Sequence, residues 1–463
     1  MNYELIELIN NYLWTYVVIT MLVGCALYFT WNLRGVQFTM LPTMLRNLFR
    51  PSSESIESIG KHKISSFQAF AISLSSRVGT GNLAGVASAI FVGGPGAVFW
   101  MWVMALLGAS TAFMEATLAQ LFKRKGIDSF YGGPAYYMKY GLKRPWMGVL
   151  FAVFIIFGFG LANQLVQSNT LCDAISSSFQ IPINYVAMAL ALITLLIIFG
   201  GIKRIARFCA CVVPFMAFGY ILLALFILVT NITEIPAMLT LIIRSAFGWE
   251  QAAGGAVGIA IMQGVKRGLF SNEAGEGSAP NAAATATIDH PVMQGLLQSL
   301  GVFTDTLVIC TCTAFIILLS GLYTSGDDGI ILTGHAMEHH LGSFGGWFLL
   351  ASIFLFAYST IIANYFYGET NVRYITGKPW AVAIFRLLSG VVVLLGGYMT
   401  LQQAWSFVDL AMALMTMLNL IAVLWLSKYA FRILQDYKQQ RKDGKKPVFH
   451  KELFPEADIE GWD

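Results

Sequence analysis

The chain has 463 residues, of which 57% are hydrophobic and only 12% are charged, and its formal net charge is +4. Soluble domains carry about 25% charged residues, so this composition excludes a soluble globular protein. Runs of about 20 apolar residues, the length that crosses a bilayer, recur along almost the whole chain. The sequence therefore predicts an all-α polytopic membrane protein.

The apolar runs predict eleven membrane-spanning helices. They cover residues 12–33, 66–92, 97–121, 147–175, 183–202, 208–230, 253–285, 295–322, 346–368, 380–399 and 403–427. If the N-terminus lies outside, 24 of the 29 Lys and Arg residues fall in cytoplasmic segments, and only Arg244 falls in an external loop. We therefore expect the N-terminus outside and the C-terminus inside. This distribution explains the positive charge by membrane orientation, with no nucleic-acid partner.

The first unusual span contains the stretch SSRVGTGNLAGVASAI, residues 75–90. Three glycines, Gly79, Gly81 and Gly85, lie in its middle, and each costs about 1 kcal/mol in a helix interior. The span 253–285 is unusual as well, because it holds four charged residues, several glycines and Pro280. Non-helical backbone at membrane depth is tolerated only where protein or water covers it. Both spans are therefore predicted to be interrupted helices, broken at 77–81 and near 263.

The positions of the two interruptions predict a repeat. Without the first span, ten spans remain, five in 64–230 and five in 253–428, and each half opens with the interrupted span. One half starts inside and the other outside, which is typical of secondary transporters built from inverted repeats. Residues 1–63 then form an extra N-terminal helix with a cytoplasmic linker, and 429–463 form a basic cytoplasmic tail.

Interrupted helices expose backbone groups that can bind ligands at the midplane. We expect the amides of Thr80, Gly81 and Asn82 to bind a carboxylate, and the carbonyls of Arg77 and Val78 to bind Na⁺. Carbonyls around Met262 and Gln263 would accept from an ammonium group. Together these groups would fit an amino-acid zwitterion. The alternative is that the glycines only allow close helix packing.

Two further polar groups stand out in apolar spans. Ser359 and Thr360 either bond back to their own helix or supply hydroxyl ligands to Na⁺. In the stretch NQLVQSNT, Gln164, Gln167 and Asn169 lie at an unusual depth, and we expect one of them to face the cavity.

Several long motifs resemble one known family. RVGTGNLAGVASAI, GGPGAVFWMWVMALLG, EATLA, GLFSNEAGEGSAPNAAA and FAYSTIIANYFYGE together resemble the sodium/alanine symporters, the alanine-or-glycine:cation symporter family, and lie between Gln68 and Glu369. The resemblance implies a leucine-transporter-like fold with one extra N-terminal helix. It also implies Na⁺-coupled uptake of a small neutral amino acid by alternating access, across a bacterial inner membrane and without an organic cofactor.

The resemblance also implies roles for single residues. Thr80, Gly81 and Asn82 match the substrate segment of the first interruption, and Gln167 and Thr360 match residues that line the family's pocket. Many members read Gly-Trp where this chain has Ala363 and Asn364. Because Asn364 brings hydrogen bonds and a smaller volume in place of an indole, glutamine, serine or a D-amino acid is an alternative substrate.

An inner gate is predicted below the midplane. Depth along the spans places several polar residues together there: Glu115, Arg267, Asn272, Glu273 and Glu276. Proton coupling through Asp305, Glu115 or Glu273 is the alternative to Na⁺ coupling.

The sequence gives weaker support to other function classes. The HAMEH stretch at His335–His339 matches a zinc-peptidase pattern, but we interpret it as an external loop with no metal site and do not expect an enzyme. A channel would not accumulate its substrate, and a receptor usually carries a signalling domain. The sequence sets no oligomeric state, and a monomer is compatible with it.

Overall fold

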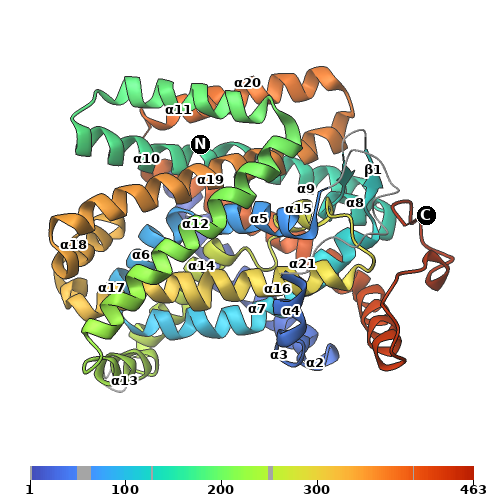
Figure 1. Cartoon of the computed structure of the whole chain (residues 1–463), viewed down its shortest axis with the longest axis horizontal. Helices are drawn as coiled ribbons and strands as arrows, with labels where there is room; N and C mark the ends of the chain where they lie inside the picture. The colour runs from blue at the N-terminus through green and yellow to red at the C-terminus, as the bar shows by residue number, and fades with distance from the viewer. Residues whose placement is uncertain (1–2, 49–63, 127–128, 249–253, 400, 463) are drawn as a thin grey trace.

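The computed structural model describes residues 3–48, 64–126, 129–248, 254–399 and 401–462. The chain is helical nearly throughout, and most long helices run roughly along the horizontal axis of Figure 1. The helices before the middle of the chain are α1 (Tyr3–Tyr12), α2 (Ile19–Asn32), α3 (Val36–Thr39), α4 (Leu41–Leu48), α5 (Ser66–Arg77), α6 (Val86–Gly93), α7 (Gly96–Leu121), α8 (Pro134–Tyr136), α9 (Pro145–Phe157), α10 (Gln164–Phe179), α11 (Ile183–Ile198), α12 (Gly201–Thr230) and α13 (Ile235–Ala246).

The second part of the chain is also built almost entirely of helices. Its helices are α14 (Gly254–Asn272), α15 (Pro280–Ala283), α16 (Val292–Val302), α17 (Thr311–Ser320), α18 (Gly329–Leu341), α19 (Ser343–Thr376), α20 (Pro379–Gly396) and α21 (Leu401–Lys442). π-type turns at 13–18, 158–163 and 303–310 join α1 to α2, α9 to α10 and α16 to α17 without ending the helix. The strands β1 (Arg124–Lys125) and β2 (Phe130–Tyr131) form a short antiparallel hairpin.

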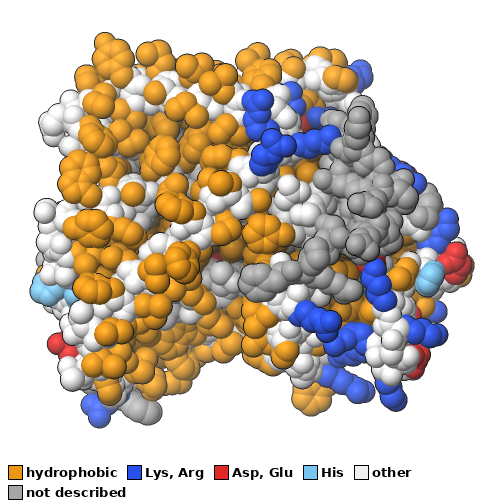
Figure 2. Space-filling model, in the orientation of Figure 1, with side chains coloured by type: hydrophobic (Ala, Val, Ile, Leu, Met, Phe, Trp, Pro, Cys, Tyr) orange, Lys and Arg blue, Asp and Glu red, His pale blue; other side chains and the backbone are white. Residues whose placement is uncertain are grey.

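Eight helices in the described part are long and apolar enough to cross a membrane. They correspond to eight of the eleven predicted spans. The other three are an interrupted pair, α5 with α6, the 16-residue helix α11, and α14, whose predicted span continues into non-helical chain. The count of eleven and the orientation of the termini therefore stay predictions. On the face shown in Figure 2, apolar side chains cover much of the surface, while Lys and Arg gather towards the end that carries the C-terminus.

The first interruption lies where the glycines predict it. A capping box starts α5: the Ser65 hydroxyl accepts from the Gln68 amide (3.1 Å) and Gln68 Oε1 accepts from the Ser65 amide (2.9 Å). The helix ends at Arg77, Val78 has non-helical angles (φ −83°, ψ 86°), and helical structure resumes at Gly81.

The predicted second interruption near 263 is wrong, because α14 is continuous through Met262, Gln263 and Gly264. A Cβ on Gly264 would lie 2.5 Å from the Ala97 carbonyl oxygen, so this glycine lets α14 pack closely against α7. The helix ends instead at Asn272. In the following residues, Glu273, Gly275 and Gly277 have positive φ angles of 56°, 96° and 83°.

The end of the chain differs from the predicted tail as well. The last predicted span ends at 427, but α21 continues to Lys442. The residues after it fold back onto the body: the Phe449 amide donates to the Asp289 carbonyl (2.9 Å), and Trp462 Nε1 donates to the Gln120 carbonyl (2.8 Å). This segment therefore packs against the end of α7 and the chain before α16.

Candidate substrate and cation site

Backbone amides at the first interruption face polar side chains. The Gly79 amide donates to Asn82 Oδ1 (2.9 Å), and the Thr80 amide donates to Gln167 Oε1 of α10 (3.1 Å). Gln167 Nε2 donates in turn to Asn163 Oδ1 (3.0 Å), which orients the amide group. The structure thus brings Thr80 and Gln167 together, with the acceptor atom of Gln167 directed at the N-terminal end of the restarting helix.

Thr360 lies beside the end of α5. Its Oγ1 is 2.8 Å from the Ser75 carbonyl oxygen, 3.4 Å from that of Ser76, 3.3 Å from that of Val78 and 2.9 Å from that of Phe356. A hydroxyl has one hydrogen, so it can satisfy only one of these four acceptors fully. Buried neutral oxygens that converge in this way form a donor set for a hard cation.

The other residues predicted around Na⁺ lie differently. The Arg77 carbonyl accepts from the Gly79 amide (3.0 Å) and is not among the oxygens around Thr360. Ser359 Oγ donates to the Phe356 carbonyl (3.0 Å) and contacts Met216 Sδ at 3.7 Å, so it bonds back to its own helix.

Close approach explains two of the glycines. A Cβ on Gly79 would lie 2.5 Å from Thr360 Oγ1, and a Cβ on Gly81 would lie 2.9 Å from the ring of Phe270. Phe270, in the last turn of α14, is therefore a site residue that the sequence analysis missed. Its ring centroid lies 4.6 Å from that of Trp405. No sequence signal pointed to it, because the end of α14 at Asn272 was itself not predicted.

Asn82 and Asn364 are directed at polar partners. Asn82 Nδ2 donates to Asp305 Oδ1 (2.7 Å), and Asp305 Oδ2 accepts from Ser271 Oγ (2.7 Å). Ser76 Oγ lies 2.8 Å from Asn364 Oδ1 and 2.5 Å from Glu273 Oε1. One hydroxyl hydrogen cannot serve both acceptors, but turning the Asn364 amide by 180° makes its nitrogen the donor to Ser76. Asn364 then belongs to a polar chain that leads from the first interruption to Glu273.

The second interruption is held by hydrogen bonds from α7 and α21. Glu115 Oε1 accepts from the Gly275 amide (3.1 Å), and Glu115 Oε2 accepts from Asn419 Nδ2 (2.7 Å), which also donates to the Gly275 carbonyl (2.8 Å). Glu273 bonds to Ser278 as well. Glu276 is fully buried, and neither of its carboxyl oxygens has a hydrogen-bond partner within the described part of the chain.

The structure gathers only part of the predicted gate. Glu115, Glu273 and Glu276 belong to the second interruption, and Asn272 Nδ2 donates to Thr306 Oγ1 beside it (3.1 Å). Including Arg267 was wrong, because its guanidinium lies 5.0 Å over the Trp405 ring and lines a separate large cavity. Depth counted along a straight helix could not show which way this side chain points.

Met262 and Gln263 also lie away from the first interruption. Met262 Sδ accepts from Thr15 Oγ1 of the N-terminal helix (3.5 Å), and Gln263 Cβ packs beside Gly93 at the end of α6. Both residues were predicted to bind the substrate only because the break was placed near 263. They lie on the continuous part of α14.

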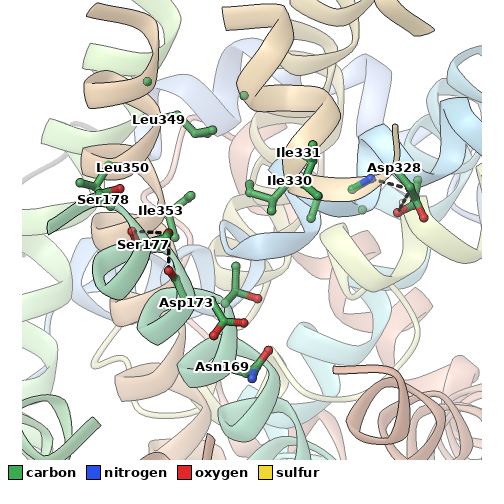
Figure 3. A pocket seen from close by; sticks show the side chains of 18 of the residues that line it. Asn169, Asp173, Ser177, Ser178, Asp328, Ile330, Ile331, Leu349, Leu350 and Ile353 are labelled. Atoms are coloured by element: carbon green, nitrogen blue, oxygen red, sulfur yellow. Dashed lines mark hydrogen bonds between the residues drawn. The ribbon is translucent and has the colours of Figure 1, made fainter. Parts of the chain in front are cut away.

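The large cavity has a volume of about 1100 Å³ and is lined by Ala84 and Gly85 next to the first interruption and by Trp405. In Figure 3, Asn169 and Asp173 approach it from one helix, Ile330 and Ile331 from another, and Leu349 and Ile353 from a third. Asp328, at the start of α18, accepts from Ser88 Oγ (2.6 Å) and closes one side. The cavity therefore forms a vestibule on the side predicted to be external.

The fold matches that of known transporters. The crystal structure of MhsT in complex with L-phenylalanine superposes with a TM-score of 0.53 over 86% of this chain and 96% of that chain, at 14% sequence identity. The chain thus has a leucine-transporter-like fold.

Comparison of sequences is more specific. A protein named "Probable sodium/glutamine symporter GlnT" from Bacillus subtilis is 48% identical over 99% of this chain and 96% of its own length. The "Sodium/proton-dependent alanine carrier protein" of Bacillus sp. PS3 is 37% identical over 86% of this chain and 94% of its own length. Both names describe the transport of an amino acid together with a cation.

The profile of one family, described as the sodium:alanine symporter family, matches residues 1–451. Together with the interrupted helices and the apolar spans, this match makes the protein a multi-pass amino acid transporter of the bacterial inner membrane and not an enzyme. The chain belongs to the sodium:alanine symporter family.

Proposed function

We propose that this protein is a sodium-coupled symporter that takes up small neutral amino acids such as alanine and glycine by alternating access. The observation that carries the proposal is the group of oxygens at the end of α5, where Thr360 Oγ1 meets the carbonyls of Ser75, Ser76 and Val78. These neutral ligands suit Na⁺, which α5 and α19 would hold between them.

The substrate would bind next to this cation. Its carboxylate would take the amides of Thr80 and Gly81, replacing Gln167 Oε1 on Thr80. Carbonyls in the last turn of α14, beside Phe270, would accept from the ammonium group in place of the predicted Met262–Gly264 carbonyls, apart from that of Leu269, which accepts from the Glu273 amide (2.7 Å). Phe270 leaves little room beside Gly81, which favours a small side chain.

Coupling follows from this arrangement. Na⁺ bound between α5 and α19 would fix the interruption in the shape that binds the substrate carboxylate. Because a ligand shifts a conformational equilibrium only through different affinities for the two states, Na⁺ would act by binding the outward-open state more tightly.

Uptake of labelled L-alanine into proteoliposomes, with and without an inward Na⁺ gradient, tests the proposal. We expect accumulation only with the gradient, and competition by unlabelled glycine. Thr360→Val should lower the apparent Na⁺ affinity by at least about tenfold, because a methyl replaces a ligand oxygen. Thr360→Ser should keep most of it, and Ser359→Ala, whose hydroxyl bonds to its own helix, should keep nearly all.

Three outcomes would contradict parts of the proposal. Accumulation without Na⁺ would contradict Na⁺ as the coupling ion. Competition by glutamine, serine or D-alanine but not by glycine would contradict alanine and glycine as the substrates. A normal Na⁺ response of Thr360→Val would contradict the proposed Na⁺ site.

A second candidate is proton coupling, and one observation favours it. The Glu276 carboxyl is buried without a hydrogen-bond partner in the described residues, and an ionised carboxylate in such a place is costly. A proton bound there would neutralise it. Uptake would then rise as the external pH falls, and Glu276→Gln would remove this dependence while the exposed control Glu234→Gln would keep it. A pH response unchanged in Glu276→Gln would exclude Glu276 as the coupling group.

A further inference from the structure

A groove of about 700 Å³ lies between α2 and α21 on the outside of the helix bundle. Thr20, Gly24 and Tyr28 line it from α2, and Leu424, Trp425 and Lys428 line it from α21. A Cβ on Gly24 would meet no atom within 4 Å, so the glycine leaves the groove open. Thr20, Gly24 and Tyr28 are spaced four residues apart and therefore lie on one face of α2, so the groove follows the axis of this helix.

The walls of the groove face the lipid. Trp425 is 61% exposed and Tyr28 is 44% exposed, and their neighbour Trp31 is 85% exposed near the end of α2. Such side chains at the surface of a membrane helix contact hydrocarbon chains, and tryptophan is typical of the interface with the headgroups. An apolar groove that runs along a membrane helix has the shape and chemistry to hold an acyl chain.

One end of the groove is positively charged. Lys428 lines it and is exposed, and it forms no ion pair within 4.0 Å with a described carboxylate. Arg34 follows the end of α2, and Lys438 lies ten residues after Lys428 on α21, or about 15 Å along the axis. The rings of Tyr28 and Phe431 lie 6.2 Å apart, so Arg34 and Lys438, which follow them by six and seven residues, lie towards the same end of the two helices.

From this arrangement we infer that the groove between α2 and α21 is a binding site for an anionic phospholipid. An acyl chain lies against Gly24 and Trp425, and the phosphate binds Lys428, with Arg34 and Lys438 adding positive potential beyond it. A zwitterionic lipid fits less well, because its cationic headgroup would face these three cations. The lipid would fix the N-terminal helix to the body of the transporter.

Thermal unfolding of the purified full-length protein in uncharged detergent tests the inference. We expect dioleoylphosphatidylglycerol to raise the unfolding midpoint by several degrees, and dioleoylphosphatidylcholine or soluble glycerol 3-phosphate to raise it little. Lys428→Gln should weaken the apparent affinity for phosphatidylglycerol about fivefold, the effect of one basic residue near a charged lipid surface. Gly24→Leu, which fills the groove, should abolish the shift.

Matched controls separate this site from general effects. Lys378→Gln removes another exposed cation before α20, and Gly219→Leu changes a glycine of α12 whose Cβ position is equally open. Both should keep the shift. Should Gly24→Leu not be recovered folded, Thr20→Leu narrows the groove one turn earlier.

Several results would overturn the inference. They are equal shifts with both lipids, an unchanged phosphatidylglycerol affinity in Lys428→Gln, a shift with glycerol 3-phosphate alone, or a dimer in native mass spectrometry that Gly24→Leu dissociates. The last result would assign the groove to a second copy of the chain.

Discussion

At the scale of single residues, Gly79 limits the geometry of the candidate cation site. It lies between Thr360 of α19 and Gln167 of α10. A Cβ at this position would be 2.5 Å from Thr360 Oγ1 and 3.2 Å from Gln167 Oε1. Only a residue without a side chain lets both oxygens come this near to the backbone. The glycine therefore couples the positions of α10 and α19 at the first interruption.

Gly79→Ala should push Thr360 away from the end of α5. Overpacking costs about 1–3 kcal/mol, so we expect the apparent Na⁺ affinity for alanine uptake to fall about five- to 150-fold. The Na⁺ dependence of uptake in proteoliposomes measures this change. Gly219→Ala, at an open position on α12, is the control and should be unaffected. An unchanged Na⁺ affinity in Gly79→Ala would show that Thr360 takes no part in cation binding.

At the scale of elements, the two interruptions differ in how well the sequence predicts them. The first contains three glycines in an otherwise apolar helix, so local propensity alone locates it. In α14 the glycines at 264 and 268 serve packing against α7, while the true interruption begins at Glu273 with a left-handed backbone. Hydropathy and helix propensity cannot distinguish packing glycines from those of a break.

Local sequence patterns could not predict the long-range contacts of the candidate site either. The hydrophobic spans predicted the class of fold, and the polar residues of the candidate site were found from their type and depth. Their partners were not: Asn82 with Asp305, Ser76 with Glu273, and Phe270 over Gly81 all join segments about 190 or more residues apart. Such pairs depend on tertiary packing, which no local pattern encodes.

The conformation of the non-helical residues that follow α14 should depend on Glu115. Because Glu115→Ala removes the acceptor of the Gly275 amide and a partner of Asn419, it leaves buried donors unsatisfied. We expect a loss of about 2–4 kcal/mol in stability, seen as a lower midpoint of thermal unfolding in detergent. Glu234→Ala, an exposed residue before α13, should change the midpoint little. A similar drop in both variants would mean that Glu115 does not hold the interruption.

At the scale of the whole molecule, the segment after α21 joins parts that are far apart in the sequence. Arg124 forms an ion pair with Asp458 (2.9 Å), Lys446 pairs with Asp289 (2.9 Å), and the Lys123 amine lies 4.0 Å over the Trp462 ring. The docked segment therefore holds the end of α7 and the chain before α16 together.

The docked segment should also respond to pH. Burial lowers the pKa of Lys123 from its usual value of 10.5 to about 7. When the segment leaves, the amine becomes hydrated and its pKa rises, so between pH 7 and 10.5 the undocked state binds more protons. Raising the pH through this window therefore favours docking, and below about pH 7 the dependence disappears.

Limited trypsin cleavage near Lys445 measures docking. The wild-type protein should be cut more slowly at pH 9 than at pH 7, after normalisation to Lys123→Met, which cannot titrate. Equal normalised rates at the two pH values would contradict the assignment of the switch to Lys123.

The position of this segment in the chain has a consequence for biosynthesis. Residues 446–462 are synthesised after α21, so Trp462 reaches the Gln120 carbonyl and the Lys123 amine only after α21 has left the ribosome. Until then, the Lys123 amine has Gln120 Oε1 (2.8 Å) and the Ala286 carbonyl (3.4 Å) as acceptors but lacks the indole ring. The end of α7 is thus covered by this segment only late in assembly, and a chain that stops before Phe449 would insert without these contacts.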